Sequence, residues 1–170
     1  MELIKVNAEY EMKPFDCGDA DLNGFLLNDA KRFAETKIAN TFVIEEEGNI
    51  MAYFCLLNDK ISKVEATNGT WRKVKKKFSH EKHFSSYPAI KIGRFAVSLS
   101  YKGQGIGSKV MLFLKYMLRD ENAYSAFRFL TVDAYLSAIP FYKKNDFEFL
   151  IPDDNNKHTR LMYFDIIRLL

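Results

Sequence analysis

The segment Tyr101–Ser108, YKGQGIGS, places three glycines at every second position between two very different stretches of chain. The preceding residues 89–99, AIKIGRFAVSL, are apolar and rich in β-branched side chains, which predicts a strand. The following residues 109–120, KVMLFLKYMLRD, repeat apolar side chains at helical spacing. Glycines in such a turn allow the backbone to approach a ligand or another segment more closely than a Cβ would permit. What lies against that backbone decides what this chain can do.

The order of predicted elements indicates the fold class. Helices alternate with strands along 170 residues, and a final pair of strands closes the chain. This order predicts an α/β or α+β sandwich around a mixed sheet, in one domain of residues 1–170. The predicted strands are 3–8, 41–46, 50–57, 89–99, 127–134, 147–150 and 159–167, and the helices lie near 22–33, 71–78, 109–120 and after 137. In the third of these helices a buried stripe is predicted at Val110, Phe113, Leu114, Met117 and Leu118.

The predicted strand before the glycine turn changes its pattern halfway. Ile90 and Ile92 occupy even positions, whereas Phe95, Val97 and Leu99 occupy odd ones. A regular strand cannot bury both sets on one face, because its side chains alternate with a period of two. We therefore expect a β-bulge at Gly93–Arg94, which would leave backbone groups able to bind a ligand.

Composition places the chain among ordinary globular proteins, since 48 % of residues are hydrophobic and 28 % are charged. No apolar run is long enough to span a bilayer, and the first residues do not form a secretory signal, so we expect a cytoplasmic protein without a membrane segment. Cys17 and Cys55 match no metal or redox spacing and are expected to be buried free thiols; no metal site is predicted.

Positive charge is concentrated in one segment. Nine Lys or Arg residues stand against two acids between Lys60 and Lys91, whereas the whole chain carries a net charge of only +3. Such a segment can attract a polyanion such as RNA, although a solvated helix face is the commoner meaning of a charge run.

Two familiar phosphate-binding loops fail at specific positions. A nucleotide P-loop needs Gly-Lys followed by Ser or Thr, but Ser108 precedes Lys109 and Val110 follows it. A dinucleotide fingerprint needs a third glycine where Ser108 stands. The remaining candidate is the acyl-coenzyme A loop, with the pattern [RQ]-x-x-G-x-[GA].

Residues 102–107, KGQGIG, fit that third pattern, with Lys102 in place of Arg or Gln. GRFAVSLSYKGQGIGSKVM resembles the strand, loop and helix unit of the GNAT N-acetyltransferase superfamily, and LTVDAYLSAIPFYKKNDFEFL resembles its following strand, helix and strand unit. The resemblance implies the GNAT fold: a mixed, mostly antiparallel sheet of six to seven strands with helices on both faces. It also implies an acetyl-CoA-dependent N-acetyltransferase, which transfers acetyl to a primary amine.

The resemblance implies roles for individual residues. Backbone groups of Phe95, Ala96 and Val97 would bond the pantetheine arm of coenzyme A, and Tyr142 would protonate the departing thiolate. Asp146 stands where the family has a glycine, and it is expected to keep the left-handed turn, which Asp tolerates. The pyrophosphate would be held by Lys102, Gly103, Gln104, Gly105, Ile106, Gly107 and Ser108.

No general base can be assigned from the sequence. Asp133, Glu45 and Glu46 lie in predicted strands, His80 and His83 lie in the basic segment, and each is more often a solvated surface residue. Water could serve instead.

The amino-terminal half resembles a narrower group, the tRNA-acetylating GNAT toxins of toxin–antitoxin pairs. FDCGDADLNGFLL resembles their Phe-x-Cys-Gly segment and Leu-x-x-Phe-Leu helix, and Pro88 precedes GRFAV as in that group. This implies aminoacyl-tRNA as the amine substrate, a homodimer and an antitoxin partner. Two alternatives remain: acetylation of a small-molecule amine, peptide or protein amino group, and a non-catalytic module that binds coenzyme A or nucleic acid.

Overall fold

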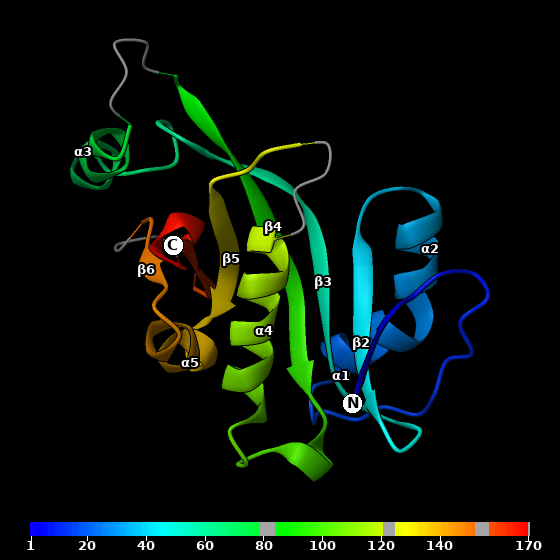
Figure 1. The fold of residues 1–170 in the computed structure, drawn as a ribbon. Helices are drawn as coiled ribbons and strands as arrows, with labels where there is room; N and C mark the ends of the chain where they lie inside the picture. Colours follow the sequence, from blue (N-terminus) through cyan, green and yellow to red (C-terminus); the bar gives the residue numbers. More distant parts are fainter. Residues whose placement is uncertain (79–83, 121–124, 152–156, 170) are drawn as a thin grey trace. The chain divides into compact units, whose positions relative to one another are not determined.

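The computed structural model describes residues 1–78, 84–120, 125–151 and 157–169. Its contacts divide the chain into two compact units. Unit 1 comprises Met1–Leu57 and Ile92–Leu114, and unit 2 comprises Asn58–Lys91 and Lys115–Leu170. Three elements pass from one unit into the other, namely β3 (Asn49–Ser62), β4 (Ser86–Val97) and α4 (Ile106–Asp120) (Figure 1). That the chain forms a single domain stays a prediction.

Hydrogen bonds join the seven strands of the described residues in the order β1-β2-β3-β4-β5-β7-β6. The β4–β5 pair is parallel, whereas β1–β2, β2–β3, β5–β7 and β6–β7 are antiparallel. This arrangement confirms the predicted mixed, mostly antiparallel sheet.

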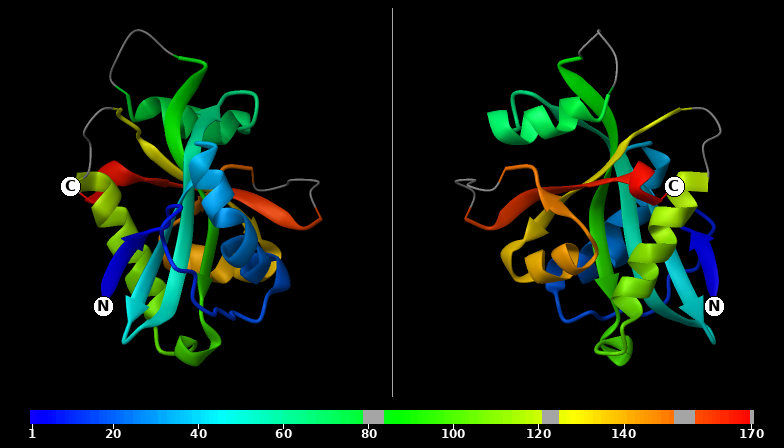
Figure 2. Two further views of the ribbon diagram at one scale, coloured as in Figure 1. Left: turned by 90° about the vertical axis from the view of Figure 1, so that its right-hand side faces the viewer. Right: turned by 60° about the vertical axis from the view of Figure 1, so that its left-hand side comes forward.

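Unit 1 begins with β1 (Glu2–Lys5), which pairs with β2 (Asn40–Glu46). The predicted strands 41–46 and 50–57 form a hairpin, β2 to β3. It closes through Glu47 and Gly48, whose φ angles of 49° and 79° are typical of a tight two-residue turn. Three short helical segments precede β2: α1 (Ala20–Gly24), a π-helical turn (Phe25–Asp29) and α2 (Ala30–Glu35). Figure 2 shows them on one face of the unit 1 strands, and the first half of α4 on the other.

The core of unit 1 forms between these helices and the strands. Phe25 and Leu26 of the π-helical turn are buried against Val6, Val43 and Tyr53. The Tyr53 hydroxyl donates a hydrogen bond of 2.7 Å to the Leu22 carbonyl, so this buried phenol is satisfied. Both cysteines are buried free thiols, which confirms the prediction.

Unit 2 contains β5 (Phe129–Tyr135), which pairs with β7 (Thr159–Asp165), and β6 (Glu148–Phe149), which pairs with the other edge of β7. A 3-10 turn (Leu136–Ala138) leads from β5 into α5 (Ile139–Lys144), which lies beside the end of that strand (Figure 2). A final 3-10 turn covers Ile166–Leu169. α3 (Asn68–Lys76) buries Trp71 and Val74 in a second core with Ile61, Tyr87, Phe129, Leu150 and Tyr163.

The predicted buried stripe of α4 is confirmed only in part. Val110 and Leu114 are buried as expected, Met117 and Leu118 are half-buried, and Phe113 is 43 % exposed. Met111 and Lys115 occupy the buried positions instead. A lysine can take such a position only when its ammonium finds partners.

Candidate functional site

The glycine loop has the backbone conformation that only glycine adopts easily. A 3-10 turn (Leu99–Tyr101) ends at Lys102, and Gly103 and Gly105 follow with φ angles of +78° and +74°. A Cβ built on either glycine would meet no atom of the described chain within 4 Å. The backbone at both positions therefore faces open space, and this cradle would be partly filled by side chains at these positions.

The loop leads directly into the amino-terminal end of α4 (Figure 1). Ile106 begins the helix, Gly107 and Ser108 follow, and the Lys109 N–H donates to the Gly105 carbonyl over 3.2 Å. The first N–H groups of an α-helix have no acceptor within the helix, and its dipole places positive potential at that end. This 15-residue helix thus presents an end suited to a phosphate group directly after the loop.

Lys102 connects the loop to a distant part of unit 1. Its ammonium donates a 2.5 Å hydrogen bond to the Cys17 carbonyl, and the Leu99 N–H donates to the Asp16 carbonyl over 2.9 Å. Gly18 has a φ of +80°, and a Cβ there would lie 3.3 Å from a Leu99 methyl carbon. The segment Phe15–Gly18 therefore packs against the glycine loop through Leu99 and Lys102.

Sequence reasoning singled out that segment only through family resemblance and did not predict this contact. Asn23 connects Asp16 and Cys17, because its amide donates to the Asp16 carboxylate and its carbonyl oxygen accepts from the Cys17 N–H. The Gly18 N–H donates to the same Asp16 carboxylate. Hydrogen bonds from Gly18 and Asn23 and the charge of Lys102 lower the pKa of Asp16. In the sequence, the closely spaced Asp and Gly residues of FDCGD were the feature that could have indicated a fixed turn here.

β4 carries Phe95, Ala96 and Val97 to the start of the loop. Its register with β5 comprises Ala89, Ile90 and Lys91 and ends there, although β4 continues to Val97 and β5 to Tyr135. Beyond Lys91 the described β4 therefore has no register partner in β5. Ala96 is buried, while Phe95 and Val97 are half-buried.

The bulge expected at Gly93–Arg94 stays a prediction. Strand β4 runs without interruption through both residues, and its buried positions do change parity, from Tyr87 and Ala89 to Ile92 and Ala96. The change thus falls between Ala89 and Ile92, earlier than expected. Gly93 serves close packing instead, because a Cβ there would lie 2.7 Å from a Leu57 methyl carbon.

Tyr142 lies in unit 2, on α5. Its side chain is buried, and its ring makes edge contacts with Phe141 and Phe147 at centroid distances of 5.2 and 5.4 Å. Burial raises the pKa of the Tyr142 phenol above its ordinary value. The helix ends as predicted, because Asp146 adopts the left-handed conformation with a φ of +64°.

Two of the acids considered as general bases, Glu45 and Asp133, are engaged in structural contacts. Glu45 is buried and accepts hydrogen bonds from Tyr10, over 2.5 Å, and from Lys13. Burial would raise the pKa of Glu45, but these two bonds outweigh it and the pKa is lowered. Asp133 accepts a 2.9 Å bond from Lys91. His80 and His83 lie outside the described residues.

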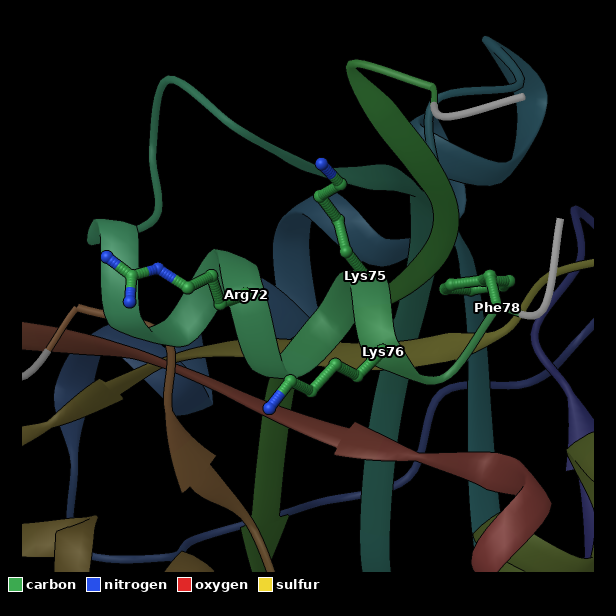
Figure 3. Close-up of a pocket in the computed structure, with 4 residues that line it drawn as sticks. All are labelled: Arg72, Lys75, Lys76 and Phe78. Carbon is green, nitrogen blue, oxygen red and sulfur yellow. The ribbon is translucent and has the colours of Figure 1, made fainter. Parts of the chain in front are cut away.

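The basic segment forms an exposed surface around α3. Arg72, Lys75 and Lys76 line a shallow groove of about 310 Å³ with Phe78, and Figure 3 shows their side chains spreading from α3 in different directions. No carboxylate of the described residues forms an ion pair with these three cations, whereas Lys77 and Lys91 of the same segment do have acidic partners. This groove is therefore a site of positive potential.

In the part of the chain that the structure describes, no group of three or more His, Cys, Asp or Glu side chains is placed to hold a metal ion. None of the described helices is long and apolar enough to cross a membrane.

A strand whose parallel register ends midway, followed by a left-handed glycine turn and a helix start, is typical of acyl-coenzyme A-dependent transferases. The sequence model of the acetyltransferase (GNAT) family matches residues 7–147, and the chain belongs to that family. It is a GNAT acetyltransferase, with the fold and enzyme class predicted from the sequence.

Known structures resemble the chain over nearly its full length. A tyrosine-to-phenylalanine mutant of KacT has a TM-score of 0.76 at 20 % identity, with 100 % of both chains covered. AtaT complexed with acetyl-methionyl-tRNAfMet has a TM-score of 0.76 at 21 % identity, covering 99 % of this chain and 97 % of that one. AtaTR bound with AcCoA gives 0.73 at 22 % identity, covering 98 % and 95 %. At these identities the likeness shows the fold.

Proposed function

We propose that this enzyme transfers the acetyl group of acetyl-CoA to the amino group of aminoacyl-tRNA. The observation that carries acetyl transfer is the open cradle at Gly103 and Gly105, which leads into the start of α4. A Cβ would enter that cradle, so the residues present fit a pyrophosphate held by backbone N–H groups. We assign this binding to Lys102–Ser108.

Strand β4 supplies the second part of the binding site in unit 1. Backbone groups of Phe95, Ala96 and Val97 would bond the pantetheine arm as a neighbouring strand would, and this is supported by the end of the β4–β5 register at Lys91. Acetyl-CoA supplies an acetyl group activated as a thioester. A backbone N–H of this segment directed at the thioester carbonyl oxygen would stabilise the charge that develops there.

Tyr142 is the proposed acid. When the amine nitrogen bonds to the acetyl carbon and the carbon–sulfur bond breaks, the Tyr142 hydroxyl would give its proton to the sulfur. A tyrosine is protonated at neutral pH, as an acid must be, and burial, which raises the pKa of Tyr142, keeps it so. The amine would lose its own proton to water, and this is supported by the structural hydrogen bonds that already engage Glu45 and Asp133.

The proposed acceptor follows from the surface of α3. Arg72, Lys75 and Lys76 form a cationic groove, which suits the phosphates of a polyanion. AtaT, a structural neighbour, was captured with acetyl-methionyl-tRNAfMet. A small-molecule amine or a peptide would not need this surface, and membership in an acetyltransferase family disfavours a non-catalytic module.

The acceptor is tested by incorporation of labelled acetyl into charged tRNA. Replacing Arg72, Lys75 and Lys76 together with alanine should raise the KM for aminoacyl-tRNA at least tenfold and reduce its salt dependence, because each phosphate contact contributes to both. The matched control removes three exposed charges elsewhere, at Lys5, Arg32 and Lys37, and should leave KM within about twofold. No incorporation into any aminoacyl-tRNA, with acetyl transfer to small amines retained, would contradict the proposed acceptor.

An antitoxin partner and a homodimer are part of the same proposal. Two further neighbours are the AtaT mutant bound to the C-terminus of the antitoxin AtaR and the KacTA–DNA complex. Light scattering on the purified chain should give twice its 19.8 kDa mass. Co-expression with a neighbouring small gene should relieve any growth arrest that the chain causes, and a monomer or a harmless chain would contradict these two points.

A further inference from the structure

Lys115 is a buried lysine whose ammonium lies at the end of α5. It belongs to the second half of α4, its exposed fraction is 3 %, and its Nζ donates a 2.5 Å hydrogen bond to the Asn145 carbonyl. Burying an ammonium is costly unless it is paired and hydrogen-bonded. A core position in α4 would be filled more cheaply by Leu or Met, so the charge needs an explanation.

The ammonium is held on its other sides by aromatic rings. Nζ lies 3.7 Å from the centroid of Phe164 and 5.3 Å from that of Phe147. Burial lowers the pKa of Lys115 to about 8, with Asp146 acting to raise it and Arg168 to lower it. Arg168 is itself paired with Glu148 over 3.2 Å. At neutral pH the side chain therefore remains largely charged.

Asn145 is the residue that ends the helix carrying Tyr142. Its N–H donates to the carbonyls of Phe141 and Tyr142, both over 3.1 Å, and its side-chain amide donates to the Phe141 carbonyl over 2.8 Å. Lys115 therefore anchors the cap of α5 at the backbone carbonyl of Asn145. Without this anchor a buried carbonyl at the end of the short helix would lose its ammonium donor.

Phe147 provides a second connection between the same residues. Its N–H donates to the Tyr142 carbonyl over 3.0 Å, and its ring contacts both the Tyr142 ring and the Lys115 ammonium. Lys115 thus contacts Asn145 and Phe147, and the N–H groups of both residues donate to the Tyr142 carbonyl. A shift of this cap would move the phenol.

We propose that Lys115 is a positioning residue for catalysis, which fixes the carboxyl end of α5 and thereby places the Tyr142 hydroxyl for proton transfer. This inference rests on the proposed acid role of Tyr142. Lys115 lies outside the glycine loop and β4, and the proposal gives it an effect on kcat through the position of Tyr142.

A double-mutant cycle tests the proposal. Lys115→Met should lower kcat about tenfold with the Kd for acetyl-CoA unchanged, because displacement of a catalytic group affects the chemical step. In a Tyr142→Phe background the same substitution should cause no further loss. Lys144→Met, which removes an exposed lysine of α5, is the control and should retain the wild-type rate. If Lys115→Met does not fold, Lys115→Gln, which removes the charge but keeps a donor, replaces it and should lower kcat by a smaller factor, again with no further loss in the Tyr142→Phe background.

Amide hydrogen exchange gives a readout that needs no activity. Lys115→Met should speed exchange of the Asn145 and Phe147 amides at least tenfold, with the β5 and β7 amides unchanged. Unchanged exchange at these amides, or equal losses of kcat in both backgrounds, would overturn the proposal. If Tyr142→Phe alone turns over at the wild-type rate, the acid assignment is wrong and the catalytic role of Lys115 is lost with it; faster exchange would then show only that Lys115 holds the helix end.

Discussion

The ammonium of Lys102 donates a 2.5 Å hydrogen bond to the backbone carbonyl of Cys17. This contact joins the glycine loop to a segment 85 positions earlier in the chain. The resemblance that identified the family predicted a role for Lys102 at a pyrophosphate and a separate Phe-x-Cys-Gly segment. In the folded chain the two features are parts of one structure, in which the segment braces the loop.

Replacing Lys102 with Met should weaken acetyl-CoA binding about tenfold, because the loop loses a charge-assisted hydrogen bond that holds it. Asn23→Ala loosens the same segment without changing Lys102 and should weaken binding two- to fivefold. Calorimetric titration with acetyl-CoA measures both, and Asn28→Ala, an exposed amide of the next helical turn, is the control. If Asn23→Ala binds acetyl-CoA normally, Lys102 acts through its charge alone.

Gly105 and Gly48 form a matched pair for testing the loop. Their φ angles are +74° and +79°, and a Cβ on either would meet no atom within 4 Å. Substitution by alanine should therefore cost each variant about 1 kcal/mol of unfolding free energy, from the left-handed backbone alone. Only Gly105→Ala should reduce the thermal stabilisation by acetyl-CoA. Equal ligand-induced shifts in the two variants would exclude the loop as the pyrophosphate site.

Much of the fold could be predicted from local pattern. The hairpin at Glu47–Gly48, the left-handed turn at Asp146 and the helix after the glycine loop depend on residues close in sequence, and the structure contains all three. The family assignment depended on the same kind of local pattern and is confirmed.

The errors arose where distant residues decide the outcome. Lys115 was not part of the predicted buried stripe, yet it is buried because the Asn145 carbonyl and two rings reach it from elsewhere in unit 2. Phe113 then points outward, since the helix has one buried face. The binding role assigned to Lys102–Ser108, and the acid role of Tyr142, stay predictions.

Tyr142→Phe should lower kcat about 100-fold and leave the unfolding free energy nearly unchanged, because the ring contacts with Phe141 and Phe147 remain. Since burial raises the pKa of this phenol, it stays protonated up to and beyond pH 10, and kcat/KM should show no descending limb from Tyr142 below that pH. Tyr116→Phe, at an exposed position of α4, is the control. A fall in kcat/KM between pH 8 and 9 that disappears in Tyr142→Phe would contradict the raised pKa.

Asp165 should make the stability of unit 2 depend on pH in the acid range. Burial would raise its pKa, but hydrogen bonds from Arg128 and Lys77 outweigh burial and lower it. Its contribution is therefore complete above the unfolded value near 4 and is lost as the pH falls through the lower folded value. Asp165→Asn should cost about 2 kcal/mol at pH 7, less than a fully buried pair because Lys77 and Arg128 are partly exposed.

Urea unfolding at pH 7 and at pH 3 measures this dependence. The difference in stability between wild type and Asp165→Asn should shrink as the pH falls, because the wild-type carboxylate becomes protonated while the amide does not titrate. Glu148→Gln removes a half-exposed acid of β6 and should change stability by less than about 0.5 kcal/mol at either pH. A constant difference would show that Asp165 does not titrate in this range.

Substitution by phenylalanine should change the unfolding free energy in opposite directions at Tyr87 and Tyr53. Both rings are buried, but the Tyr53 hydroxyl donates to the Leu22 carbonyl over 2.7 Å, whereas the Tyr87 hydroxyl has no hydrogen-bond partner in the described chain. Tyr87→Phe should raise the unfolding free energy by about 1 kcal/mol, because it removes a desolvated group and keeps the stacking on Phe78 at 4.0 Å. Tyr53→Phe should lower it by about 1 kcal/mol. Thermal unfolding of both variants decides, and a loss of stability in Tyr87→Phe would mean that its hydroxyl is satisfied in solution.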